Sequence, residues 1–198
     1  MVMTMTETMT MNGKIETIIS VPPGAVRQDY SKVGANIIFA ASDPPGSQLG
    51  SGGGTANILY EAWQSTRQNN ASFNDWLNTT RKLIIHGSGQ SRRLPAYAAE
   101  SKLMLPLPLF PSMKGQHPDQ RLINLQESSC RHIVRHAPDS YRMIVACGDT
   151  LVTSPDAMPI FPQVDVLIAG ISASPEEARN HGVIFCPVDN PQTLTFFL

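Results

Sequence analysis

Short apolar runs recur along the chain, and segments with apolar residues at helical spacing lie between them. The runs occupy residues 36–41, 82–86, 142–147, 164–169 and 182–187. Each has the length and composition of a β-strand. Residues 56–68 and 120–136 instead place apolar side chains along one face of a helix. Strands that alternate with helices predict an α/β fold with a mostly parallel sheet.

Capping residues predict where the helices begin. Thr55 is placed to cap the helix at 56–68, and Ser72 is placed to cap a second helix. The sequence Ser-Pro-Glu-Glu at residues 174–177 combines a capping serine with a proline and acids in the first turn, so a further helix is expected there. The proline after Asn190 can open a last helix.

The two ends of the chain differ from its middle. Residues 1–11 alternate Met and Thr without the basic start and apolar core of a secretory signal, and residues 14–34 have no clear pattern. We therefore expect an irregular segment over 1–35 and one domain over 36–198. Residues 194–198 are apolar. They indicate either a terminal element docked on the core or a domain that is incomplete at its C-terminus because the chain continues in a longer protein.

The composition excludes several functional classes. With 41% hydrophobic and 16% charged residues, the 198-residue chain has the balance of a folded domain. A net charge of -1 argues against binding nucleic acid through a broad basic surface, and no apolar run is long enough to span a membrane. Cys130, Cys147 and Cys186 are far apart, which fits a reducing, cytoplasmic compartment and supplies no metal motif.

One stretch, residues 83–95, has the organisation of a polyphosphate-binding site. It opens with a short apolar strand and continues into a loop of small and cationic residues. The loop consists of Gly87, Ser88, Gly89, Gln90, Ser91, Arg92 and Arg93. Small residues let backbone N–H groups approach phosphate oxygens, and fixed cations neutralise the charge. We therefore expect this loop to hold a phosphorylated ligand.

A second glycine-rich stretch follows the strand at 36–41. We expect it to form a loop before the helix at 56–68 and to bind the phosphates of a nucleotide through Gly50, Gly52, Gly53, Gly54 and Thr55. Ligands of parallel sheets bind beyond the carboxyl ends of the strands, which would gather both loops and Asp149 at one edge. Neither loop matches the P-loop or the dinucleotide fingerprint. Tight turns without a ligand are the alternative for both loops.

Single charged residues add to this site, each with an ordinary alternative. Lys102 can reach a phosphate as a point charge, or it can extend from the sheet edge into solvent. Asp149 follows an apolar strand and Gly148, where a carboxylate can hold Mg²⁺ together with water and phosphate, or can be a turn residue. Arg92 and Arg93 can be solvated surface charges instead of ligand contacts.

The histidines supply no catalytic motif. His132 and His136 lie four residues apart on a predicted helix without the glutamate of a zinc protease motif, so we expect an exposed helix face. His86 ends the central strand, and it either packs in the site or only terminates the strand. The segment 87–91 does not match a serine nucleophile elbow.

Two motifs together resemble a known family. Asp-Pro-Pro-Gly at 43–46 with Leu-Gly-Ser-Gly-Gly-Gly-Thr at 49–55 resembles the first signature of L-fucose-1-phosphate guanylyltransferases. His-Gly-Ser-Gly-Gln-Ser-Arg-Arg-Leu-Pro at 86–95 resembles the second. The resemblance runs from about residue 37 to residue 198, and it extends to the N-terminal part of bifunctional fucokinase/guanylyltransferases. It implies a Rossmann-like nucleotidyltransferase domain that is incomplete at its C-terminus.

The resemblance also implies site roles. Aligned on the Arg-Leu pair of the wider sugar nucleotidyltransferase family, Arg93 and Lys102 take the positions of residues that bind the triphosphate and stabilise the transition state. Asp149 takes the position of a metal ligand, and the implied cofactor is Mg²⁺. Ser88 and Ser91 stand where the wider family has glycines, so this loop departs from the family pattern.

The implied reaction is transfer of GMP from GTP to L-fucose 1-phosphate, which gives GDP-L-fucose and pyrophosphate. Positioning and charge neutralisation would supply most of the catalysis. The family continues with a lysine-proline motif, a second metal carboxylate and a β-rich region, and the bifunctional proteins add a sugar kinase domain. Because these features are not found in the 198 residues, we expect weak activity or none from this chain alone. The alternatives are a nucleotide-binding module without catalysis and an α/β interaction domain.

Overall fold

The computed structural model describes residues 14–26, 29–30, 33, 36–87, 89, 95–108, 119–152, 160–179, 182–185, 189 and 196–197. The chain divides into two compact units, residues 1–163 and 164–198. No linker in the sequence indicates this division. Among the described residues, no helix has both the length and the hydrophobicity needed to cross a membrane.

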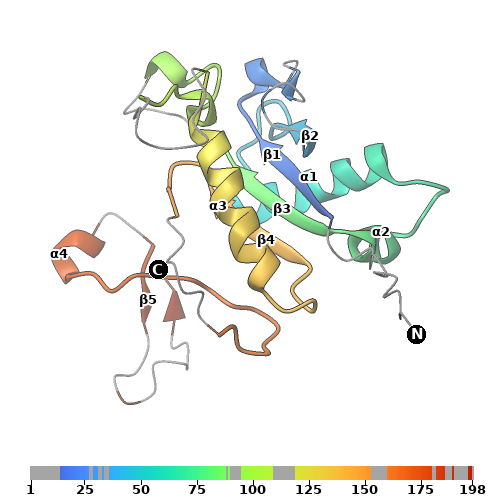
Figure 1. The fold of residues 1–198 in the computed structure, drawn as a ribbon. Helices are drawn as coiled ribbons and strands as arrows, with labels where there is room; N and C mark the ends of the chain where they lie inside the picture. The colour runs from blue at the N-terminus through green and yellow to red at the C-terminus, as the bar shows by residue number, and fades with distance from the viewer. Residues whose placement is uncertain are drawn as a thin grey trace, which may run out of the picture. The chain divides into compact units, whose positions relative to one another are not determined.

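A parallel sheet of four strands forms the centre of the first unit (Figure 1). Its order is β2-β1-β3-β4. The strands are β1 (Ile15–Ser20), β2 (Ile37–Ala41), β3 (Arg81–His86) and β4 (Met143–Cys147). Ser20 pairs with His86, and His86 pairs with Cys147, so these carboxyl ends are level with one another. The prediction of an α/β fold with a mostly parallel sheet is confirmed.

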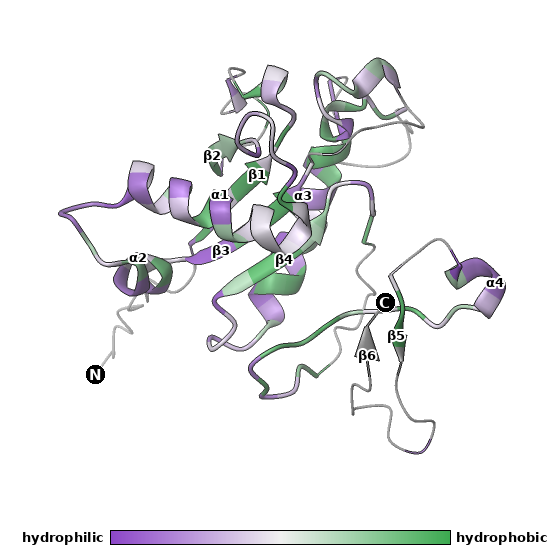
Figure 2. Cartoon of the chain, turned by 180° about the vertical axis from the view of Figure 1, so that it is seen from behind, coloured by the Kyte–Doolittle hydropathy of each residue, from purple (hydrophilic) through white to green (hydrophobic). Residues whose placement is uncertain are grey.

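Helices cover both faces of this sheet because the strand side chains alternate between two apolar cores. One core joins Ile18 and Ile84 to α1 (Gly50–Thr66) and α2 (Phe73–Thr79). The other joins Ile19 and Ile85 to α3 (Leu122–His136). Figure 2 shows hydrophobic residues along β1 and β2. Burial on both faces explains why the apolar run of β3 could be recognised from the sequence.

The predicted irregular segment over 1–35 is wrong for β1, which is a central strand of the sheet. Two polar residues interrupt its apolar pattern, and distant residues satisfy them. Thr17 Oγ1 donates to Glu127 Oε1 at 2.8 Å, and Glu16 Oε2 accepts from Lys82 Nζ at 2.9 Å. Residues 23–25 of this segment form a short 3-10 helix, η2 (Pro23–Ala25).

The glycine-rich stretch at 50–55 is not a loop, and that prediction is also wrong. These residues form the first turns of α1, whose N-cap is Leu49 and not Thr55. Glycine lowers helix stability by only about 1 kcal/mol per residue, so packing further along the helix can offset it. Ile58, Leu59 and Ala62 provide that packing against the sheet.

The other predicted elements of the first unit are confirmed. The strands at 36–41, 82–86 and 142–147 correspond to β2, β3 and β4. The helix at 120–136 corresponds to α3. Ser72 caps α2, and its side chain accepts a hydrogen bond from the backbone of Asp75.

The second unit carries short elements. Residues 164–169, predicted as a strand, form no strand, and Val166 is 76% exposed. A strand needs a ladder partner as well as apolar residues, and these residues pair with none of the described strands. The predicted helix start is confirmed by α4 (Pro175–Ala178) and its capping box. Within 182–187, β5 (Ile184–Phe185) pairs antiparallel with β6 (Phe196–Phe197). The expected helix from Asn190 lies outside the described residues.

Candidate functional site

The carboxyl edge of the sheet is the point where the chain connections diverge. From β1 the chain continues to β2 on one side, and from β3 it continues to β4 on the other. Helices α1 and α3 cover opposite faces of the sheet. In open parallel sheets, such a switch point leaves a crevice beyond the strand ends, where ligands bind. The crevice between the ends of β1 and β3 is therefore the candidate site.

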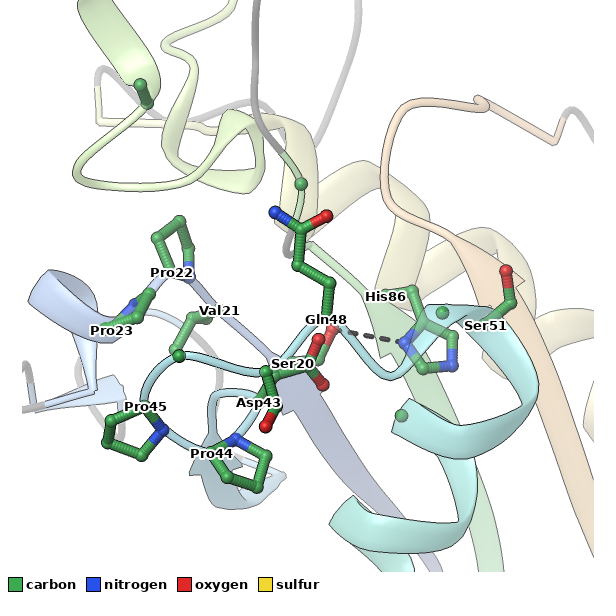
Figure 3. A pocket seen from close by; sticks show the side chains of 16 residues that line it. Ser20, Val21, Pro22, Pro23, Asp43, Pro44, Pro45, Gln48, Ser51 and His86 are labelled. Carbon is green, nitrogen blue, oxygen red and sulfur yellow. Dashed lines mark hydrogen bonds between the residues drawn. The ribbon is translucent and has the colours of Figure 1, made fainter.

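A pocket of about 530 Å³ occupies this crevice (Figure 3). Residues at or after the carboxyl ends of three strands line it: residues 20–23 of β1 and its extension, residues 43–48 after β2, and His86 at the end of β3 with Gly89 beyond it. The first turns of α1 contribute Gly50, Ser51 and Gly54. The volume lies within the range of small-molecule sites.

His86 lines the pocket and joins three elements. Its Nδ1 is 3.1 Å from Ser20 Oγ of β1, and its Nε2 is 2.7 Å from Thr55 Oγ1 of α1 (Figure 3 draws the first contact). Burial lowers the pKa of the imidazole below its usual 6.5, and the nearby Asp43 carboxylate opposes that shift in part. His86 is therefore a neutral residue packed in the site, which decides between the two alternatives for it.

The amino end of α1 lies against the pocket at Gly54, where even a Cβ atom would make only ordinary contacts. A Cβ atom at Gly54 would lie 3.4 Å from Asp43 Oδ1 and 4.0 Å from the His86 ring. Asp43 in turn accepts a hydrogen bond from the backbone N–H of Leu49 at 3.2 Å. The five predicted nucleotide-binding residues of this stretch divide accordingly. Gly50 and Gly54 line the pocket, and Thr55 contacts His86. Gly52 and Gly53 are not among the described lining residues.

The loop after β3 begins with a glycine that no other residue could replace without rearrangement. A Cβ atom at Gly87 would lie 2.2 Å from the Leu103 side chain and 2.7 Å from Ser101 Oγ. Ser101 Oγ donates to the carbonyl of Gly87 at 2.8 Å, and the Gly87 amide donates to the carbonyl of Ser20 at 2.8 Å. Gly89 lines the pocket. The predicted residues Ser88, Gln90, Ser91, Arg92 and Arg93 lie outside the described residues.

Lys102 and Asp149, predicted separately, lie together. Lys102 is in the short 3-10 helix η5 (Lys102–Met104), next to Ser101, which holds Gly87. Its Nζ is 3.4 Å from Asp149 Oδ2 in the turn after β4. The two side chains are 32% and 63% exposed, so solvent reaches both charges. The candidate phosphate-binding lysine and the candidate metal ligand thus form one exposed pair.

A backbone hydrogen bond from one side and a glutamine side chain from the other hold the turn that carries Asp149. The amide of Gly148 donates to the carbonyl of His86 at 2.8 Å, and a Cβ atom at Gly148 would lie 2.4 Å from that same oxygen. From α3, Gln126 donates to the carbonyls of Cys147 and Thr150. Sequence reasoning missed Gln126. The available signal was an amide on the apolar stripe that Ile123 and Cys130 define.

The residues present fit a magnesium ion that binds through few protein ligands. No group of three or more His, Cys, Asp or Glu side chains with metal-binding geometry occurs in the described part of the chain. Asp149 is a single exposed carboxylate, and Mg²⁺ usually binds through one or two carboxylates together with phosphates and water.

The prediction of an exposed helix face at His132 and His136 is confirmed, since both residues lie exposed on α3.

Comparisons with known proteins show which family the chain belongs to. Its sequence matches the model of the fucose pyrophosphorylase domain over residues 74–195. It is 34% identical to the L-fucokinase/L-fucose-1-P guanylyltransferase of Bacteroides fragilis over 186 residues, which are 93% of this chain and 20% of that protein. It is 24% identical to the bifunctional fucokinase/GDP-fucose pyrophosphorylase of Arabidopsis thaliana over 170 residues, or 76% of this chain and 16% of that protein. No solved structure matches it. The chain therefore spans a fifth or less of the length of these relatives.

Proposed function

Because the chain belongs to the fucose pyrophosphorylase family, we propose that it contributes the nucleotide-binding part of a sugar-1-phosphate guanylyltransferase. The proposed reaction transfers GMP from GTP to L-fucose 1-phosphate and releases pyrophosphate. The observation that carries the proposal is the Lys102–Asp149 pair, which lies beside the Gly87 loop at the carboxyl edge of the sheet. The names of the two relatives supply the choice of guanine and fucose.

The proposed role of Lys102 is to bind the triphosphate. Its side chain is 32% exposed and its ammonium group pairs with the Asp149 carboxylate, so a phosphate oxygen can replace or share that partner. Asp149 would hold Mg²⁺, which supplies charge neutralisation at the phosphates when bound. Gly89, which lines the pocket, would let the backbone approach the phosphates closely. The Gly87 amide is already bonded to the Ser20 carbonyl, so Gly87 would set the path of the loop. Arg93 keeps its proposed role as the second phosphate-binding cation.

The proposed transfer of GMP depends on charge stabilisation more than on proton transfer. The attacking oxygen of a sugar phosphate is already anionic, so no general base has to remove a proton from it. His86 fits this picture, because its lowered pKa keeps it neutral and hydrogen-bonded to Ser20 and Thr55. We therefore assign His86 to shaping the pocket and give it no acid–base role.

Calorimetric titration with GTP and MgCl₂ tests the proposal. The unaltered chain should bind the nucleotide, and Lys102→Ala should weaken binding by about tenfold or more, because one charge-assisted contact is lost. Arg135→Ala is the matched control, since it removes a cation in the last turn of α3 and should leave binding unchanged. No binding at millimolar GTP would overturn the proposal and favour an interaction domain.

Pyrophosphate release separates catalysis from binding alone. We expect the chain with GTP, MgCl₂ and L-fucose 1-phosphate to release pyrophosphate slowly or not at all, and a protein of the relatives' full length to release it readily. Nucleotide binding without release in both proteins would favour the non-catalytic alternative. Release that is equal with mannose 1-phosphate would contradict the assignment of fucose.

A further inference from the structure

Gln126 is a buried amide that bridges the turn carrying Asp149. The side chain is 2% exposed in the interior of α3. Its Nε2 donates to the carbonyl of Cys147 at 3.2 Å and to the carbonyl of Thr150 at 3.0 Å. These two carbonyls flank Gly148 and Asp149. One NH₂ group therefore closes the turn from the side of the helix.

The turn is held from its other side by β3. The Gly148 amide donates to the His86 carbonyl at 2.8 Å, and the contact is too close for any side chain at position 148. The backbone around Asp149 is thus fixed at three points while its side chain remains 63% exposed. A fixed backbone beneath an exposed carboxylate is the arrangement expected of a positioned ligand group.

The chemistry of the bridge requires an amide. The two carbonyls of the turn both accept from Gln126, and the NH₂ group of glutamine supplies one hydrogen to each. The opposite orientation would place Oε1 against two carbonyl oxygens. Oε1 itself has no hydrogen-bond partner among the described residues although it is buried. Leaving a buried acceptor unpaired has an energetic cost, so the side chain is placed here for its donors.

We propose that Gln126 is a positioning residue that sets the Asp149 carboxylate relative to Lys102 and to the metal–nucleotide complex. This inference rests on the proposed function, since it assigns Asp149 to the metal. Gln126 acts only through the backbone of the turn and touches no ligand. Partners of this indirect kind change metal affinity or activity by about 10- to 100-fold when they are removed.

Hydrogen exchange tests the bridge without any ligand. In Gln126→Met, which keeps the length of the side chain and loses both donors, the Gly148 amide should exchange about tenfold faster because the turn opens more often. Ser128→Ala, at an exposed position of the same helix, is the control and should leave this amide unchanged. If Gln126→Met does not fold, Gln126→Glu serves as the second variant. Unchanged exchange at Gly148 would overturn the proposal whatever the chain binds.

A double-substitution cycle tests positioning against a merely structural role. Gln126→Met should weaken binding of GTP with MgCl₂ about tenfold in the unaltered chain and have almost no further effect in an Asp149→Asn background. Equal losses in both backgrounds would show a structural role and overturn the proposal. If the unaltered chain binds no GTP, the proposed function fails, and the positioning role toward the nucleotide fails with it. The exchange of Gly148 then still decides whether Gln126 holds the turn.

Discussion

Two lysine–carboxylate pairs lie at opposite ends of the same sheet, and they differ in burial. At the amino end, Lys82 Nζ is 2.9 Å from Glu16 Oε2, and the lysine side chain is 0% exposed. At the carboxyl end, Lys102 Nζ is 3.4 Å from Asp149 Oδ2, and both side chains reach solvent. The chemical groups are alike, so the surroundings must explain any difference in role.

The buried pair is closed by further contacts. Lys82 also donates to Thr80 Oγ1 and lies 4.4 Å above the ring of Trp76. Glu16 accepts a second hydrogen bond from Thr80 at 2.8 Å and pairs with Lys14 at 3.1 Å. These groups leave little for a ligand to bind. The exposed pair lacks such enclosure, so burial, and not residue type, separates the structural pair from the pair to which we assign a binding role.

Removing one member of the buried pair is expected to have the largest effect. Lys82→Ala should lower the free energy of unfolding by about 3 kcal/mol, because it leaves the mostly buried Glu16 carboxylate without its main partner. Urea unfolding followed by circular dichroism measures the loss. The double variant Glu16→Gln with Lys82→Met should recover part of it, since no unpaired charge remains. A loss below about 1 kcal/mol would contradict the distinction between the two pairs.

Removing the carboxylate of the exposed pair should affect binding and leave stability intact. Asp149→Asn should change the free energy of unfolding by less than about 0.5 kcal/mol, because exposed ion pairs contribute little. It should raise the MgCl₂ concentration needed for half-maximal GTP binding by about tenfold, since the metal loses a charged ligand. Titration of magnesium at fixed GTP measures this shift. An unchanged magnesium dependence would contradict the metal assignment.

The carboxyl edge of the sheet also contains a titratable group, His86. Burial lowers the pKa of His86 below 6.5. The unfolded chain therefore binds a proton more readily than the folded chain. The contribution of His86 to stability is complete above about pH 6.5 and is lost as the pH falls through the folded-state pKa. The His86→Gln variant keeps hydrogen-bonding capacity without titrating. The free energy of unfolding of this variant should therefore fall less between about pH 7 and about pH 5 than that of the unaltered chain. Unfolding curves at several pH values test this, and equal slopes in both proteins would contradict it.

The sequence predicted the elements whose pattern is local. The apolar run at Leu83, Ile84 and Ile85 is buried on both faces, so its composition alone identified β3. β1 escaped recognition because its polar residues find partners far away, with Thr17 bonded to Glu127 across 110 residues. Residues 164–169 show the reverse, since apolar composition without a ladder partner produced no strand.

For the candidate site too, local patterns could be predicted from the sequence and long-range contacts could not. Asp149 and Lys102 were predicted from their places after a strand and a loop, and the structure brings them within 3.4 Å. The helical geometry of residues 50–55 was missed because glycine content predicts a turn, while packing of Ile58 and Leu59 against the sheet decides for a helix. Gln126 stands out as an amide on an apolar helix stripe, but its partners could not be predicted, since they are backbone carbonyls that any sequence carries.

The smallest effect on stability is expected from replacing Lys14, an exposed lysine that pairs with the same carboxylate as Lys82. Its Nζ is 3.1 Å from Glu16 Oε1, but its side chain is 69% exposed, in contrast to Lys82 on the same carboxylate. Lys14→Ala should lower the free energy of unfolding by less than about 0.5 kcal/mol, because solvent screens the pair and Lys82 still neutralises Glu16. Urea unfolding of Lys14→Ala beside Lys82→Ala measures this directly. Because both lysines contact one carboxylate, equal losses would mean that burial does not decide the role of an ion pair in this sheet.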